Sequence, residues 1–261
     1  MGLSFIEVIP FLLTNLLYPL MSPKKDSVQK MFDDISPKYD FLNHFLSFGI
    51  DFSWRKKLVA LLSKRHPQRI LDVATGTGDV AIALTHLNPE QIVGIDISEK
   101  MLDIARRKVA EKGMQKIISF KQSDAERIPF SDGSFDAVTV AFGVRNYENL
   151  HKGLSEMKRV LRPDGTMMIL EFSHPVATPL KQFYRFYSRF VIPFIGKLIS
   201  SHSDAYRYLP ESVAAFPSGD DFLRILKELG LTNCIQNTLS FGIASIYSCQ
   251  VPDKIKTTGQ R

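Results

Sequence analysis

The sequence predicts an α/β protein whose parallel sheet carries helices on both faces, and two observations lead to this fold class. The apolar run 70–74 is followed by a turn containing Gly76 and Gly78 and then by a helical segment. This order of strand, tight turn and helix is typical of doubly wound proteins that bind nucleotide-like ligands. A second apolar run, 92–96, ends in Asp96, whose carboxylate can accept hydrogen bonds from both hydroxyls of a ribose.

The remaining elements alternate between strands and helices along the chain. We expect strands at 70–74, 92–96, 117–121, 135–141 and 165–172, and helices at 79–87, 98–112 and 149–161. Repeated alternation of this kind favours a parallel sheet with helices on both faces. In such a sheet the ligand lies at the carboxyl ends of the strands, near the reversal in strand order.

Two helical segments precede the first strand. Apolar positions recur at helical spacing in 28–35 and again in 51–62. These segments are predicted to form either a lid over the ligand site or a plain packing layer on the sheet.

The two ends of the chain differ from the predicted domain at 24–251. Residues 1–23 are largely apolar, but this stretch is interrupted by Pro10 and Pro19 and is too short to span a membrane. It also lacks the features of a signal peptide. Three interpretations stay open: a mis-called start with Met21 as the first residue, an interfacial membrane anchor, or part of the fold. The tail at 252–261 is polar and is expected to be disordered.

The composition fits one globular domain of a reducing cytosol. Of the 261 residues, 44% are hydrophobic and 23% are charged, which suits a single sizeable core. Cys234 and Cys249 form no pattern typical of a disulfide framework or a zinc site, so no metal is expected. The net charge of +6 favours anionic partners, but it is too dispersed to indicate nucleic acid.

The glycine turn alone leaves two cofactors open. Gly76, Gly78 and Ala81 satisfy the loose G-x-G-x-x-A pattern of nicotinamide dinucleotide sites. Asp72 and Asp79 flank the turn, and their negative charge is unfavourable beside a pyrophosphate but tolerable beside the sulfonium and ammonium of S-adenosylmethionine. The charges near the turn therefore favour S-adenosylmethionine.

Asp124 and Ala125 follow the third expected strand. The carboxylate of Asp124 can accept a hydrogen bond from the adenine amino group, and the backbone N–H of Ala125 is available to a ring nitrogen. The alternative is that Asp124 caps only its own turn.

Several longer strings occur together in this chain. They are Tyr39-Asp40 with Leu42-Asn43, Trp54-Arg55, Gly76-Thr-Gly-Asp79, Asp124-Ala-Glu126, Phe142-Gly-Val-Arg-Asn146, Leu170-Glu-Phe-Ser173 and Asp204-Ala-Tyr-Arg-Tyr-Leu209. On these strings the chain resembles the quinone C-methyltransferase family of menaquinone and ubiquinone biosynthesis. The resemblance implies a class I S-adenosylmethionine-dependent methyltransferase fold, a Rossmann-like sheet with an N-terminal helical lid. It also implies that the cofactor is held by Gly76, Thr77, Asp96, Asp124 and Ala125.

The implied reaction is C-methylation of demethylmenaquinol in menaquinone biosynthesis; the alternative substrate is 2-methoxy-6-polyprenyl-1,4-benzoquinol in ubiquinone biosynthesis. A ring carbon becomes nucleophilic when a neighbouring hydroxyl loses its proton, so the reduced quinol is the expected substrate. Arg145 and Asn146 are expected near that oxygen, where Arg145 stabilises its charge, and Tyr39 is expected to orient the second hydroxyl. Alternatively, Arg145 forms an ion pair with Glu148 or Asp40 that holds the lid.

Two weaker alternatives come from other classes of protein. One is a nicotinamide-dependent oxidoreductase, and the other is a non-catalytic cofactor-binding membrane adaptor.

Some members of the family carry Ser where this chain has Ala141, so any hydrogen bond from that hydroxyl is missing here.

The segment 183–194 is strongly aromatic, and Lys181, Arg185 and Arg189 recur at every fourth residue. This pattern is typical of a membrane interface; an apolar tunnel for a polyprenyl tail and an ordinary core helix are the alternatives. We therefore expect a cytoplasmic protein that is peripheral on the inner face of the cytoplasmic membrane. The expected partners are the polyprenylated quinol, the membrane surface and a second copy of the chain, with no nucleic acid.

Overall fold

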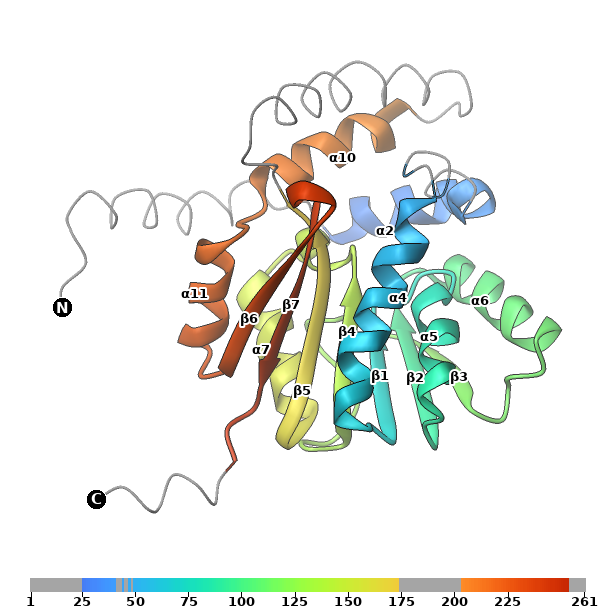
Figure 1. Cartoon of the computed structure of the whole chain (residues 1–261). Coiled ribbons are helices and arrows are strands. Elements are labelled where there is room, and N and C mark those ends of the chain that lie inside the picture. Colours follow the sequence, from blue (N-terminus) through green and yellow to red (C-terminus); the bar gives the residue numbers. More distant parts are fainter. Residues whose placement is uncertain (1–24, 41–43, 45–46, 48, 174–202, 254–261) are drawn as a thin grey trace, which may run out of the picture.

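The computed structural model of the chain describes residues 25–40, 44, 47, 49–173 and 203–253. These residues form a seven-stranded sheet in the order β3-β2-β1-β4-β5-β7-β6 (Figure 1). The strands are β1 (Arg69–Val73), β2 (Gln91–Asp96), β3 (Ile118–Gln122), β4 (Phe135–Ala141), β5 (Leu161–Phe172), β6 (Thr232–Leu239) and β7 (Ala244–Gln250).

The neighbouring strands from β3 to β5 run parallel, as expected, but β7 is antiparallel to both of its neighbours. The prediction of a parallel sheet is therefore wrong for β6 and β7, a region where no strand was expected from the sequence. The antiparallel pairing of β6 with β7 follows from the short segment that joins them. The two strands are joined by the short 3₁₀ turn η6 (Ser240–Gly242), and so short a connection can link only antiparallel strands.

Helices cover both faces of the sheet (Figure 1). They are α2 (Lys25–Ile35), α4 (Ile50–Leu62), α5 (Asp79–Leu84), α6 (Glu99–Glu111), α7 (Leu150–Val160), α10 (Ser203–Ala215) and α11 (Asp220–Glu228). Short 3₁₀ turns extend or join them: η1 (Ser36–Lys38), η2 (Ser63–Arg65), η3 (Thr85–Leu87) and η4 (Val144–Asn146). Each strand and helix expected between 70 and 172 is present, although β5 begins earlier, at Leu161.

Two hydrophobic cores form because successive residues of a strand point to opposite faces of the sheet. In β1, Ile70 lies in the core that includes Leu58 of α4. The next residue, Leu71, lies in the core that includes Leu154 of α7 and Phe222 of α11. The apolar face of each helix is therefore buried against one side of the sheet, and the strand ends are left to form a site.

The carboxyl ends of the parallel strands meet below α2 and α10 (Figure 1). Val28 and Phe32 of α2 line a pocket at this edge, so the first helical segment forms the lid. The second segment, α4, instead packs on the sheet through Trp54 and Leu58. Both interpretations of the N-terminal helices are thus realised, one by each helix.

Three expectations concern residues outside the described part of the chain: the extension at 1–23, the aromatic segment at 183–194 and the tail from 254 onward. Among the described residues, no helix combines the length and the apolar character needed to cross a membrane. In the same residues, no group of three or more His, Cys, Asp or Glu side chains is placed to hold a metal ion.

Candidate active site

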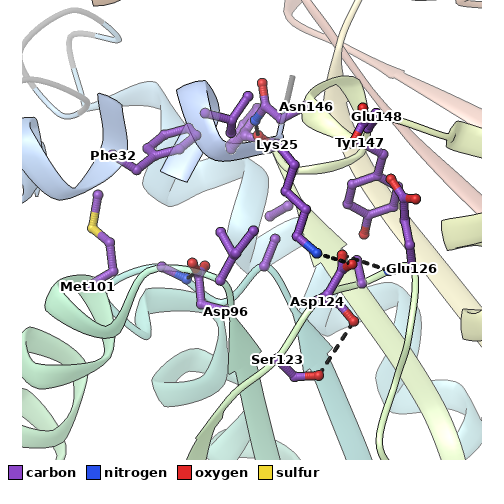
Figure 2. A pocket seen from close by; sticks show the side chains of 18 of the residues that line it. Lys25, Phe32, Asp96, Met101, Ser123, Asp124, Glu126, Asn146, Tyr147 and Glu148 are labelled. Atoms are coloured by element: carbon purple, nitrogen blue, oxygen red, sulfur yellow. Dashed lines mark hydrogen bonds and ion pairs between the residues drawn. The ribbon is translucent and has the colours of Figure 1, made fainter. Parts of the chain in front are cut away.

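A pocket opens at the carboxyl edge of the sheet (Figure 2). It encloses about 720 Å³ of empty space, including the part open to solvent. Its walls come from α2, the glycine turn, the end of β2, and the loops that follow β3 and β4. Both the lid helix and the carboxyl ends of the strands therefore contribute to one pocket.

The glycine turn forms the floor of the pocket. Gly76 and Gly78 have φ values of +57° and +82°, a left-handed conformation that glycine adopts without steric cost. A Cβ at Gly78 would lie 3.1 Å from the side chains of Ala105 and Phe120. The turn therefore lies close to α6 and β3, and this packing leaves space above Gly76 for a ligand.

Asp96 connects the glycine turn to the end of β2. Its Oδ2 accepts a hydrogen bond from the backbone N–H of Gly76 at 2.8 Å, and its Oδ1 accepts one from Ser98 N–H at 2.9 Å. Burial raises the pKa of Asp96 to about 6. The carboxylate is thus held in place at the pocket wall, where it can accept further hydrogen bonds from a ribose.

We expect the affinity for S-adenosylhomocysteine, the demethylated form of the cofactor, to fall below pH 6. In the predicted binding mode the ribose hydroxyls donate to the ionised carboxylate of Asp96, so protonation near its pKa of about 6 removes the negative charge and one acceptor oxygen. Affinity should then drop by up to about tenfold per pH unit. Isothermal titration calorimetry between pH 5 and 8 measures this slope.

Asp96→Asn is the control, because it should bind weakly at every pH with a flat profile. Acid unfolding does not explain a loss of affinity below pH 6. The raised pKa of Asp96 stabilises the folded state at low pH, and this stabilisation is lost as the pH rises through about 6, so the protein does not lose stability through Asp96 when the pH falls. A steep profile that persists in Asp96→Asn would contradict the assignment.

Asp124 and Ala125 also line the pocket. Asp124 Oδ1 accepts a hydrogen bond from Glu126 N–H at 3.0 Å, so the local turn that was the alternative interpretation is present. Its Oδ2 forms an ion pair with Lys25, which reaches down from the lid (Figure 2). Asp124 therefore connects the lid to the pocket wall, and an adenine amino group would compete with Lys25 for it.

Thr77, Asp72 and Asp79 lie outside the pocket lining. The buried hydroxyl of Thr77 donates to Asp40 at 2.5 Å, so its predicted part in cofactor binding stays a prediction. Asp72 is buried and accepts hydrogen bonds from the hydroxyls of Thr75 and Thr139 at 2.6 Å each. Asp72 thus stabilises the turn, Asp79 forms ion pairs with Lys108 and Arg55, and neither carboxylate lines the pocket.

Arg145 is buried behind the pocket lining. Its Nη1 donates to Glu171 Oε1 at 2.7 Å and to the carbonyl of Phe142 at 2.6 Å. Burial disfavours the charged guanidinium, but Glu171, Tyr208 and Tyr39 together outweigh this effect, and the pKa of Arg145 is raised. Arg145 therefore stays protonated, and its ion-pair partner is Glu171 instead of the expected Glu148 or Asp40.

Asn146 and Tyr39 do line the pocket. Asn146 Oδ1 accepts a hydrogen bond from the hydroxyl of Tyr208, on α10, at 2.8 Å. Burial raises the pKa of Tyr208 to about 12, so this hydroxyl remains a donor at neutral pH. The amide nitrogen of Asn146, which lies 3.4 Å from the carbonyl of Phe142, keeps a second hydrogen for a ligand.

The role of Tyr208 was missed in the sequence analysis, although the string 204–209 pointed to its neighbourhood. Glu171 was missed in the same way within the string 170–173. Both residues are distant in sequence from their partners, and only the folded chain brings Glu171 of β5 beside Arg145 and Tyr208 of α10 beside Asn146.

The charges of the pocket fit S-adenosylmethionine better than a dinucleotide. Four carboxylates line it, those of Asp96, Asp124, Glu126 and Glu148, and Lys25 is the one lining cation among the described residues. Carboxylates can accept hydrogen bonds from the ribose and the adenine amino group, and they offset a sulfonium charge. A pyrophosphate would instead be repelled by them.

The fold and this site define an S-adenosylmethionine-dependent methyltransferase. The sequence profile of the ubiE/COQ5 methyltransferase family matches residues 20–250. The chain belongs to this family, and S-adenosylmethionine is its cofactor. The family assignment selects the methyltransferase over the oxidoreductase and confirms the predicted fold class and cofactor.

Individual relatives agree with this assignment. A demethylmenaquinone methyltransferase of Bacteroides fragilis is 48% identical over 86% of this chain and 92% of its own length. A ubiquinone/menaquinone biosynthesis C-methyltransferase UbiE of Geotalea uraniireducens is 46% identical over 87% of this chain and 97% of its own length. In fold, the chain is similar to the crystal structure of a SAM-dependent methyltransferase from Aquifex aeolicus, with a TM-score of 0.51, 19% identity, and coverage of 70% of this chain and 82% of that one.

Proposed function

We propose that this enzyme methylates a ring carbon of demethylmenaquinol to give menaquinol. The observation that carries the proposal is the 48% identity to the demethylmenaquinone methyltransferase of Bacteroides fragilis over most of both chains. A relative at 46% identity is named for both ubiquinone and menaquinone biosynthesis. Methylation of 2-methoxy-6-polyprenyl-1,4-benzoquinol is therefore the second candidate.

The proposed chemistry divides between the cofactor and the residues of the pocket. Bound S-adenosylmethionine supplies an electrophilic methyl group on sulfur. Asp96, Asp124 and Ala125 hold the nucleoside and so align this methyl group with the substrate ring. The reacting hydroxyl of the quinol gives its proton to water, and Asn146 donates its second amide hydrogen to the resulting oxyanion, whose charge activates the neighbouring ring carbon. Once methylated, this carbon would release its hydrogen to water as a proton, which restores the aromatic ring, and the cofactor would leave as S-adenosylhomocysteine. Tyr39 orients the second hydroxyl.

In this proposal Arg145 is a positioning residue that does not touch the substrate. Its guanidinium is paired with Glu171 and binds the carbonyl of Phe142. The same carbonyl is within reach of the Asn146 amide. Arg145 therefore holds the loop that presents Asn146, and its raised pKa argues against a role as general base.

The test is quinone analysis of a strain that lacks the gene. Accumulated demethylmenaquinone, reversed by the plasmid-borne gene, supports the proposal, whereas an accumulated methoxy-benzoquinone precursor supports the second candidate. The purified enzyme should also transfer labelled methyl from S-adenosylmethionine to reduced demethylmenaquinone. The oxidised quinone is the matched control and should not react. If neither demethylmenaquinol nor the methoxy-benzoquinol acquires the labelled methyl group, both candidate functions are wrong.

A membrane surface is the proposed partner, because the substrate carries a polyprenyl tail. Ile50 and Phe52, at the start of α4, are exposed large apolar residues, and Phe241 in η6 is 84% exposed. Trp54 Nε1 donates to Ser240 Oγ at 2.8 Å, which brings α4 and η6 together at the edge of the sheet where β5 ends. We propose that this edge faces the inner leaflet of the cytoplasmic membrane.

We expect Phe241→Ser to reduce sedimentation of the protein with vesicles of anionic lipid, since burial of one aromatic side chain contributes about 1.5–3 kcal/mol. Ile235→Ser is the matched control, because Ile235 is 58% exposed but lies on β6, away from η6. Vesicle binding that is unchanged in Phe241→Ser would contradict docking through this edge.

A further inference from the structure

The lid and the glycine turn are joined outside the pocket by the ammonium group of Lys108, near the end of α6. Lys108 Nζ lies 2.9 Å from Asp40 Oδ2, forms an ion pair with Asp79 and lies 3.3 Å from Thr77 Oγ1. The other carboxylate oxygen of Asp40 accepts the hydrogen bond from Thr77. Asp40 ends the stretch 25–40, which comprises α2, η1 and the two residues after them and is called the lid from here on. Thr77 belongs to the glycine turn, and Asp79 begins α5.

This cluster acts on the pocket through the residue next to Asp40. Tyr39 lines the pocket, and its ring packs edge-on against Phe32 of α2, with ring centroids 6.0 Å apart. A Cβ at Gly76 would lie 3.9 Å from the same ring. Because Asp40 directly follows Tyr39 in the chain, the contacts that hold Asp40 also restrain the ring of Tyr39 beside the glycine turn.

We propose that Lys108 is a positioning residue that holds the lid closed over bound cofactor. A second ion pair between described residues of the lid and the core, Lys25 with Asp124, lies inside the pocket. It must open if Asp124 binds the adenine. The contacts of Lys108 lie outside the pocket lining, so they are compatible with an occupied site and can persist while the cofactor is bound.

The electrostatics explain why one lysine can have this effect. Asp40 and Asp79 contact the same ammonium, so their carboxylates lie close together and repel each other once it is removed. Asp79 would keep Arg55 Nη2 at 3.5 Å and His44 Nε2 at 3.8 Å. Within the described part of the chain, the carboxylate of Asp40 would keep only the hydrogen bond from the hydroxyl of Thr77. The repulsion would therefore be relieved by movement of the lid.

The test compares Lys108→Met with Arg106→Met, a control on the same helix whose ion pairs with Glu99 and Asp103 are exposed. Lys108→Met should bind S-adenosylhomocysteine about tenfold more weakly through faster dissociation, because a smaller fraction of the protein has a closed lid. Hydrogen exchange in 28–40 of the ligand-free protein should become faster, with the melting temperature close to that of the control. Neither measurement depends on the identity of the quinol.

A second variant separates positioning from a structural role. In Lys108→Met/Asp40→Asn the repulsion is gone, so cofactor dissociation should be slower than in Lys108→Met alone, and Lys108→Arg should retain most of the affinity. The proposal is overturned if Lys108→Met dissociates from S-adenosylhomocysteine as slowly as Arg106→Met. It is also overturned if affinity and melting temperature fall together and Asp40→Asn restores neither.

Discussion

Arg145→Ala is expected to lower the free energy of unfolding by about 3–5 kcal/mol and to reduce methyl transfer severely. Glu171 is 0% exposed, and without the guanidinium its carboxylate would remain buried without a counter-charge, which is the costly way to break a buried pair. The carbonyl of Phe142 would also lose its shorter hydrogen bond and keep only the Asn146 amide nitrogen, at 3.4 Å. Urea denaturation measures the stability, and transfer of labelled methyl to the quinol measures the turnover.

The double variant Arg145→Met/Glu171→Met distinguishes the two effects. It leaves no unpaired charge in the core, so most of the lost stability should return. Turnover should stay low, because methionine cannot hold the carbonyl of Phe142 and the loop that carries Asn146. Recovery of both stability and turnover would mean that Arg145 has no positioning role. Loss of cofactor affinity in the double variant would place its effect on the nucleoside instead.

Asn146→Ala is expected to reduce kcat by about 10²–10³, the usual cost of losing one donor to a developing oxyanion. The affinity for S-adenosylhomocysteine should change little, since the nucleoside is assigned to Asp96 and Asp124. Single-turnover kinetics with the reduced quinol, together with calorimetry on the by-product, give the two quantities separately.

Tyr208→Phe is the matched variant for this prediction. It keeps Asn146 but removes the hydrogen bond to its Oδ1, so the amide is no longer held in one orientation. We expect a smaller fall in kcat, about tenfold, with the KM for the cofactor unchanged. If Tyr208→Phe is as slow as Asn146→Ala, then Tyr208 itself touches the substrate. If both variants keep normal turnover, the oxyanion lies elsewhere.

The central part of the fold could be predicted because each element has a local signal. Strands such as β1 and β2 are buried on both faces and appear as apolar runs, and Ser98 caps α6 by accepting a hydrogen bond from Met101 N–H. The last two strands carry a weaker signal. The edge strand β6 is only partly buried and mixes Asn, Gln and Thr with apolar residues, so neither alternation nor an apolar run marks it.

In the site, too, residues placed by the order of the strands could be predicted, whereas contacts between distant segments could not. Gly76, Asp96, Asp124 and Ala125 follow strand ends, and topology alone brings these ends to one edge. Arg145 could be recognised as important, but its partner could not be chosen from the sequence. That choice depends on β4 and β5 being neighbours, which brings Glu171 beside the loop after β4. The contact of Thr77 with Asp40 likewise depends on the position of the lid relative to the glycine turn, which the sequence does not give.

The antiparallel course of β7 has a practical consequence for biosensor work. Gln250, at the end of β7, pairs with Thr166 near the start of β5, at the opposite end of the sheet from the pocket. Lys25, in contrast, lies in the pocket wall. If the protein is immobilised through an attachment after Asp253, the pocket should therefore stay accessible to ligand in solution. A fusion partner placed directly before Lys25 would instead lie beside the pocket and hinder ligand entry.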